Sequence, residues 1–227
     1  MSLQTIINIS DSMVIDRRKV VGIQYTRNEI PRVNLTPTMN PWRFTLTVPS
    51  FLKYNQARDL IEELDRLDRV YPETIKFNNN PKLAWMFRYR GVASTNQIGA
   101  MRVVSFVGNQ LVLGTLPAIG GTRPLFEKND LIQIGNFPYP FTSTTQVLRG
   151  NGATVTVTTN RPNILTSNVV NQGITVGSGC QFKLFCPNMP TYKLVAGGTA
   201  YEGDTLVSNA FIEWSDSFQL YEYLGTV

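Results

Sequence analysis

The sequence predicts a mainly β protein: a β-sandwich that carries one α-helix, with a small β-barrel domain inserted after that helix. Two observations carry this prediction. Short apolar stretches separated by turn residues recur along most of the chain, and only one segment has strong helical periodicity. With 227 residues, 42% of them hydrophobic, the chain is long enough to bury a core without a disulfide or a metal.

The first fifth of the chain predicts short strands. β-branched residues gather in residues 3–10 and 20–26, and such residues favour extended backbone. In residues 42–48 every second side chain is apolar, which is the pattern of a strand with one buried face. We therefore expect the chain to begin with strands of a half-buried sheet.

A single helix is predicted over residues 56–70, with Asn55 as its N-cap. On the face opposite the apolar residues, arginine alternates with aspartate and glutamate. Ion pairs between such residues stabilise a helix by only about 0.2 to 0.5 kcal/mol each. Packing on a sheet must therefore hold the helix, and the charged run is its solvated face. The apolar residues at helical spacing are Ala57, Leu60, Ile61, Leu64 and Leu67.

A domain boundary is predicted soon after the helix. Tyr71-Pro72 ends the helix, a short strand follows at residues 74–77, and the cluster Asn78–Pro81 marks a loop. Evenly spaced strands then suggest a small barrel or a compact sandwich. They are expected at residues 85–89, 101–107, 110–113, 130–134, 141–147 and 153–158.

Glycine and asparagine mark the expected turns. Gly108-Asn109 and Arg149–Gly152 separate strands of the insertion, and Asn188–Pro190 and Gly197-Gly198 punctuate the C-terminal region. Residues 163–178 have no regular pattern and are expected to connect the insertion to the last strands.

The chain is expected to end with strands at residues 181–186 and 218–224. Residues 1–83 and 179–227 would then form the sandwich, and residues 84–178 the inserted split-barrel-like domain. A continuous single β domain is the alternative, because strand periodicity does not say which strands pair.

The charge pattern argues against nucleic-acid binding, although the net charge is +5 and the pI near 9.3. The only dense basic run is Arg17, Arg18 and Lys19, and aromatic residues do not interleave with it. Apolar residues flank this run, so it is either an edge strand protected against aggregation or a docking site for an acidic neighbour. Both interpretations stay open.

A second candidate docking surface contains Phe137 and Tyr139, which alternate with prolines after Gly135-Asn136. An exposed loop of this kind would bind a partner protein. The interpretation that we prefer is a hairpin whose aromatic rings fill the small barrel.

The residue types exclude most catalysis. The sequence contains no histidine, which removes the commonest general base and the His-containing zinc sites. Its two cysteines, Cys180 and Cys186, share one face of a predicted strand, so a disulfide is not expected. No phosphate loop or calcium loop is present. We expect a protein that is not an enzyme, with no catalytic residue, no cofactor and no metal.

One acidic cluster is the remaining candidate for catalysis, because a pair of carboxylates can cleave a glycosidic bond. Glu202, Asp204, Glu213 and Asp216 lie in turn-rich sequence near Trp214, where a sugar site is conceivable. The N-terminus lacks the pattern of a signal peptide and no apolar stretch is long enough to cross a membrane, so we expect synthesis in a cytoplasm without membrane insertion.

Several segments together resemble virion structural proteins of contractile-tailed, T4-like bacteriophages, which are related in layout to distal tail and baseplate hub proteins. Each segment is weak alone, but they are scattered in order over most of the chain. They are Arg17–Gly22 with Pro41–Phe44, Glu62–Tyr71, Lys128–Ile134 with Tyr139-Pro140, and Pro190–Leu194 with Phe218–Glu222.

This resemblance implies a tail-tube-like β-sandwich with one flanking helix and an inserted split barrel. Copies would form a homo-oligomeric ring, six-fold, that joins the tail tube to baseplate hub, wedge or receptor-binding proteins in the virion. Asn129 stands where similar sequences often carry glycine, and asparagine tolerates the left-handed backbone that such a turn needs. The alternative role is a carbohydrate-binding or host-recognition module of the virion.

Overall fold

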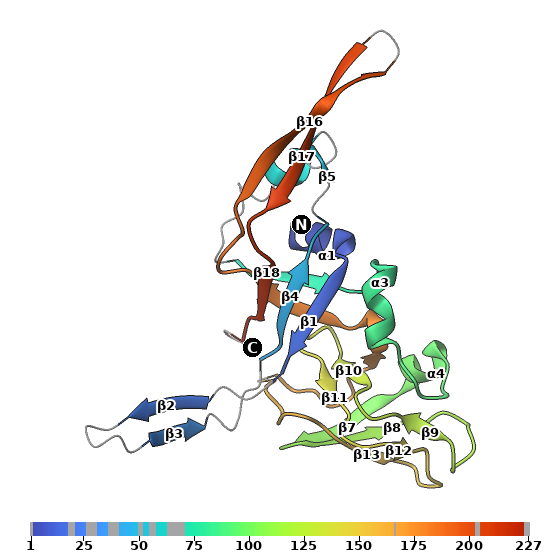
Figure 1. The fold of residues 1–227 in the computed structure, drawn as a ribbon. Helices are drawn as coiled ribbons and strands as arrows, with labels where there is room; N and C mark the ends of the chain where they lie inside the picture. The colour runs from blue at the N-terminus through green and yellow to red at the C-terminus, as the bar shows by residue number, and fades with distance from the viewer. Residues whose placement is uncertain are drawn as a thin grey trace. The chain divides into compact units, whose positions relative to one another are not determined.

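The protein is mainly β, as predicted, with 39% of its residues in strands and 17% in helices. Figure 1 shows a computed structural model, and the sheet pairings given below are antiparallel. The structure describes residues 2–17, 21–25, 31–35, 41–49, 52–54, 58–62, 71–165, 167–202 and 205–224.

The chain divides into two compact units. Unit 1 comprises Met1–Ile15, Arg43–Ala84 and Lys183–Tyr223. Unit 2 comprises Asp16–Trp42, Trp85–Phe182 and Leu224–Val227. Residues 16–42 thus cluster with unit 2, whereas the predicted division gives them to the first domain; that division stays a prediction.

Unit 1 is built on a five-stranded sheet in the order β1-β4-β18-β15-β6. Phe44 and Leu46 in β4 are buried opposite Leu220 and Phe218 in β18, which confirms the alternation read from residues 42–48. The strands are β1 (Ser12–Asp16), β4 (Arg43–Thr47), β18 (Phe218–Glu222), β15 (Gln181–Phe185) and β6 (Glu73–Lys76).

The predicted strand at residues 3–10 is wrong, because helix α1 (Ser2–Ile9) occupies this segment. The Gln4 side chain fixes it to β6: its Nε2 donates to the Lys76 carbonyl oxygen, and the Lys76 amide donates to its Oε1, both over 2.8 Å. Leu3, Ile6 and Ile7 are buried, and this spacing of three and four residues is helical.

The predicted helix at residues 56–70 is described only in part. Residues 58–62 are helical, Leu60 and Ile61 are buried as expected, and Arg58 pairs with Glu62 over 3.5 Å on the exposed side. Asn55 and residues 63–70 lie outside the described part of the chain.

The longest strands in the described residues form one hairpin, which the sequence analysis missed. Strand β16 (Tyr192–Glu202) pairs with β17 (Thr205–Trp214), drawn in orange and red in Figure 1, and β5 (Leu52–Lys53) pairs with β17 at Phe211 and Ile212. The predicted turn at Gly197-Gly198 is wrong, because both glycines lie within β16, where the register shifts.

A shorter hairpin consists of β2 (Val21–Tyr25) and β3 (Pro31–Leu35). Strand β2 confirms the strand predicted at residues 20–26, whereas β3 was not expected.

Unit 2 contains three small antiparallel sheets, with strand orders β13-β8-β7, β11-β10-β14 and β12-β9. Their strands are β7 (Arg102–Val107), β8 (Gln110–Gly114), β9 (Pro124–Phe126), β10 (Leu131–Ile134), β11 (Phe141–Thr142), β12 (Val147–Leu148), β13 (Val155–Thr158) and β14 (Ile174–Val176). Four of the predicted strands of the insertion are confirmed by β7, β8, β10 and β13. Closure of these sheets into a barrel stays a prediction.

Other local predictions for this unit need correction. The strand predicted at residues 85–89 is wrong: 3-10 helix η1 (Trp85–Phe87) follows helix α3 (Pro81–Ala84). The strand predicted at residues 141–147 is broken into β11 and β12. Helix α4 (Thr95–Ala100), with a capping box at Ser94, and 3-10 helix η2 (Gly177–Gly179) complete the described elements.

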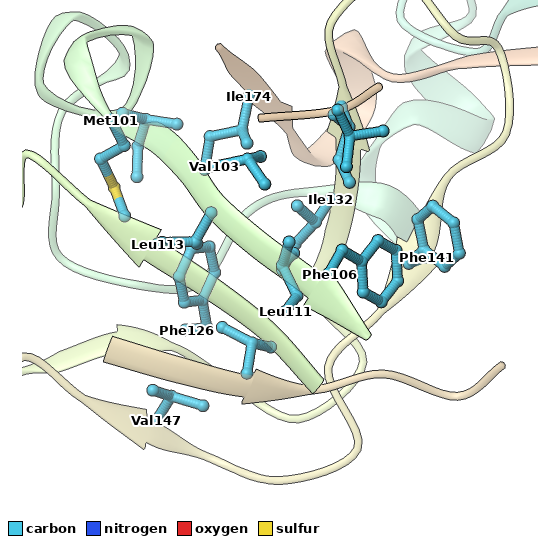
Figure 2. Packing of buried hydrophobic residues seen from close by; sticks show 14 of the residues in the cluster. Met101, Val103, Phe106, Leu111, Leu113, Phe126, Ile132, Phe141, Val147 and Ile174 are labelled. Carbon is cyan, nitrogen blue, oxygen red and sulfur yellow. The ribbon is translucent and has the colours of Figure 1, made fainter. Parts of the chain in front are cut away.

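One hydrophobic cluster joins the three sheets of unit 2. Figure 2 shows residues of this cluster, with the ring of Phe106 from β7 edge-on to that of Phe141 from β11 at 4.9 Å. The Arg161 guanidinium lies 5.2 Å from the Phe141 ring and its Nη2 donates to the Pro140 carbonyl oxygen over 3.0 Å, although this side chain is almost fully buried.

Both cysteines are buried and reduced. Cys180 and Cys186 flank β15, and their Sγ atoms lie 3.4 Å from the carbonyl oxygens of Thr175 and Asn188, respectively. Burial raises the pKa of the Cys180 thiol well above its ordinary value.

Candidate functional site

The structure describes three of the five residues predicted to dock a partner, and it does not bring these three together. Arg17 lines a groove on unit 2, whereas Arg18 and Lys19 lie outside the described residues. Phe137 and Tyr139 belong to a different part of the same unit.

We call this depression the Arg17 groove. It has a volume of about 390 Å³ and is open to solvent. Thr142 and Ser143 are buried residues of the lining, while Lys128 is exposed. The full lining is Arg17, Lys128, Asn129, Thr142, Ser143, Thr144 and Asn160.

The Arg17 side chain is held in place by two contacts. Its guanidinium carbon lies 4.8 Å from the centroid of the Trp42 ring, a cation–π contact, and its Nη1 donates to Thr142 Oγ1 over 3.4 Å. Burial lowers the pKa of Arg17 from its ordinary value, yet an arginine keeps its charge at neutral pH. The groove therefore carries a fixed positive charge.

The hydroxyl and amide groups around the groove are fixed by backbone partners. Ser143 Oγ donates to the Thr145 carbonyl oxygen over 2.6 Å, and Thr144 Oγ1 donates to that of Thr158 over 3.0 Å. Asn160 Oδ1 accepts from the Thr142 amide over 2.9 Å. These bonds make the lining a preformed polar surface.

Asn129 adopts the left-handed conformation, with φ of 70°, as its place in the predicted turn required. Its amide donates to the Ser143 carbonyl oxygen over 2.8 Å, which ties the turn to the groove. The next residue, Asp130, is buried, and its carboxylate accepts from the amides of Arg90 and Glu127 over 3.1 and 2.8 Å. Desolvation is the main reason why the pKa of Asp130 is raised.

The predicted aromatic loop does not add a ring to this groove. Tyr139 is only 3% exposed and belongs to the hydrophobic cluster of unit 2, and Phe137 packs against that cluster. This placement fits the interpretation in which the rings fill the interior, so we leave both residues out of the docking surface.

A second pocket lies beside Trp214 in unit 1, with a volume of about 370 Å³. Its charged members, Lys193 and Glu213, pair with each other over 2.8 Å. The Trp214 ring packs edge-on between those of Tyr192 and Phe218, at 5.7 and 5.0 Å. A ring held by its neighbours in this way is a poor platform for stacking a sugar.

The other acidic residues near Trp214 do not assemble into a site in the described part of the chain. Asp216 Oδ1 accepts from the amide of Ser217 over 2.7 Å. The Glu202 side chain and Asp204 lie outside what the structure describes. Two carboxylates facing each other across a cleft are therefore not seen among the described residues.

Searches for two other kinds of site give negative results for the described residues. No group of three or more Asp, Glu, Cys or His side chains there could hold a metal ion. No helix in that same part of the chain is sufficiently long and apolar to cross a membrane.

Comparisons with known proteins identify no relative. No protein-family model matches the sequence, and no curated protein matches it. The proposed function therefore depends on the resemblance of the sequence segments described above and on the geometry of the described residues.

Proposed function

We propose that this protein is a non-enzymatic structural subunit of a bacteriophage tail tip or baseplate, in which copies form a ring between the tail tube and the surrounding proteins. In this proposal the five-stranded sheet of unit 1 belongs to a tail-tube-like β-sandwich, and unit 2 is the inserted split barrel. The protein would be located in the virion.

The observation that carries the proposal is the β16–β17 hairpin. Strands of 11 and 10 residues extend for about 35 Å at roughly 3.3 Å per residue. In the sheet order β16-β17-β5, β16 is an edge strand over its whole length, as far as the described strands go. Such an edge presents unpaired backbone groups along one side.

Both faces of β16 are open near its start. Leu194 is 51% exposed and Val195 is 41% exposed. Because successive side chains of a strand point to opposite faces, neither face is covered at this position. A long apolar edge of this kind favours association with another chain, and repeated association through one heterologous interface produces a ring when the rotation closes.

The assembly state tests the proposal. Native mass spectrometry and negative-stain microscopy of the full chain, alone and with purified tail tubes, should show closed rings of one size, and six-fold symmetry is expected. A monodisperse monomer that does not bind tail tubes would contradict the proposal.

A pair of variants tests whether the hairpin makes the contact. Leu194→Lys with Val195→Lys should abolish ring formation, because two charges would have to be buried at the interface. The matched control is Val104→Lys with Val107→Lys, two exposed valines of β7 in unit 2, which should leave the rings intact. Equal behaviour of the two double variants would exclude the hairpin as the interface.

The carbohydrate-binding alternative would place a sugar in the Trp214 pocket through hydrogen bonds to its polar lining, because the Trp214 ring itself is a poor stacking platform. It predicts that the isolated protein is retained on host surface glycans and that Trp214→Ala removes this retention. An enzymatic role would require turnover of capsule or peptidoglycan.

A further inference from the structure

We propose that the Arg17 groove receives an acidic side chain, aspartate or glutamate, from a loop of a different protein. This inference goes beyond the proposed ring, because it uses a surface of unit 2 and not the hairpin of unit 1. It would stand if the ring were disproved.

Charge is the first reason. Two cations, Arg17 and Lys128, line the groove, and no carboxylate is among its described lining residues. Asp130, which follows Asn129, directs its carboxylate to two backbone amides. Glu127 Oε1 accepts from Gln146 Nε2 over 2.9 Å. Neither acid is part of the groove lining, so no carboxylate of the described lining competes with an external anion for Arg17 and Lys128.

Preorganisation is the second reason. The Trp42 ring and Thr142 already restrain the Arg17 guanidinium, so less conformational entropy is lost when it binds a carboxylate. Since Thr142 Oγ1 accepts from Arg17, its own hydrogen can be donated to an incoming oxygen. A carboxylate in the groove could thus accept from a guanidinium and a hydroxyl at once.

The same geometry disfavours nucleic acid. Binding of single strands relies on exposed aromatic rings on which bases stack. Trp42 is 2% exposed and Arg17 covers one face of its ring, so it offers no such platform. A second copy of this chain, with its net charge of +5, is a less favourable occupant of this positively charged groove than an acidic protein, and the ring proposed above forms through the apolar hairpin edge and not through the groove. An acidic partner protein fits best.

The test uses the full-length protein and a fluorescein-labelled hexaglutamate peptide, with fluorescence anisotropy at low salt. Hexaglutamate should bind at least about tenfold more tightly than hexaglutamine, and added salt should weaken it. The double variant Arg17→Gln with Lys128→Gln should lose about tenfold in affinity.

A matched control separates the groove from general charge attraction. Arg88→Gln with Arg123→Gln removes the same charge from two exposed arginines of unit 2 that do not line the groove, and it should change the affinity less than about twofold. If Arg17→Gln disturbs folding, the single variant Lys128→Gln still tests the groove. Lys128 is exposed, so its replacement should leave the fold intact and weaken binding of the peptide. In the unsubstituted protein, carbodiimide coupling should join the peptide to Lys128.

Three results would overturn the inference. Equal losses of hexaglutamate affinity in the two double variants would mean that the peptide binds only by non-specific charge attraction. If a single-stranded oligonucleotide with the same charge as hexaglutamate bound more tightly than hexaglutamate, and if this binding depended on Arg17, the ligand would be a nucleic acid. Self-association that Arg17→Gln abolishes would identify a second copy as the occupant.

Discussion

The interior of unit 2 and the β16–β17 hairpin of unit 1 differ in what stabilises them. In unit 2 one hydrophobic cluster contains residues from all three sheets, including Leu113, Ile132 and Phe126, each fully buried. On the hairpin, the corresponding described cluster consists of Ile61 and Ile212 with two partly buried aromatic rings against it.

This difference indicates how each region serves the protein. Burial of apolar area contributes about 25 cal/mol per Å², so a cluster that joins several sheets stabilises its unit without help. A long hairpin with an open edge depends more on its backbone pairing, and a partner strand can extend that pairing. The first region is stabilised by its own core, whereas the second leaves an edge strand at which pairing can continue.

Phe141→Ala should give the largest loss in the free energy of unfolding. A small loss would contradict the comparison between the interior of unit 2 and the hairpin. Removing this ring eliminates the edge contact with Phe106 and the ring face beneath the Arg161 guanidinium, so we expect a loss of about 3 to 5 kcal/mol in the free energy of unfolding. Urea denaturation measures it. Val107→Ala, at a 75% exposed position, should change the stability by no more than about 0.5 kcal/mol.

Ile212→Ala should have a smaller and more local effect. It truncates the fully buried side chain of the hairpin cluster, and we expect a loss of about 2 to 3 kcal/mol. Hydrogen exchange should accelerate in the amides of β17 and remain unchanged in those of β8. If β8 accelerated to the same extent, the two regions would be one cooperative unit and the comparison would fail.

The burial of Tyr89 in unit 2 can be tested by the dependence of stability on pH. Its hydroxyl donates to the Leu125 carbonyl oxygen, and desolvation raises the pKa of Tyr89 from 10.0 to about 12. Tyr89 therefore ionises at a lower pH in the unfolded chain than in the folded protein. The free energy of unfolding should fall as the pH rises from about 10 to 12.

Tyr89→Phe should remove this alkaline loss and cost about 1 kcal/mol at neutral pH through the lost hydrogen bond. Absorbance titration at alkaline pH should show the disappearance of the tyrosine that ionises at about pH 12. A titration unchanged by the substitution would place that tyrosine elsewhere.

The smallest effect on folding is expected at the start of β16. Leu194→Ala and Val195→Ala should each change the free energy of unfolding by less than about 0.5 kcal/mol, because both side chains are substantially exposed. Leu113→Ala, at a fully buried position of β8, is the contrast and should cost about 2 to 5 kcal/mol. Equal costs at the two positions would mean that the hairpin is packed within the monomer.

Local sequence patterns predicted two kinds of element: strands whose buried and exposed side chains alternate, and strands that end at a turn marked by glycine or asparagine. Strand β4 and the strands around Gly108 were found because burial on one face imposes a period of two and glycine permits the positive φ of 53° at that turn. Helix α1 was missed because β-branched residues favour strands in general, while the spacing of Leu3, Ile6 and Ile7 decides in favour of a helix here.

Features that depend on distant pairing were not predictable in this way. The Gly197-Gly198 pair suggests a turn locally, yet the pairing of β16 with β17 carries the strand through it with a register shift. In the candidate site, the basic run identified Arg17, and the Asn129 turn had been noted. Thr142 and Asn160 join them only through the fold, so no spacing in the sequence connects the four residues.

The two buried thiols make this chain convenient to label. Cys180 and Cys186 are 1% and 2% exposed, so thiol reagents should leave both unmodified in the folded protein. A cysteine introduced at an exposed position such as Val107 would then be a unique attachment point for a fluorophore or a gold cluster. Such a label would report whether copies of the protein associate, because fluorophores on neighbouring copies would come close together.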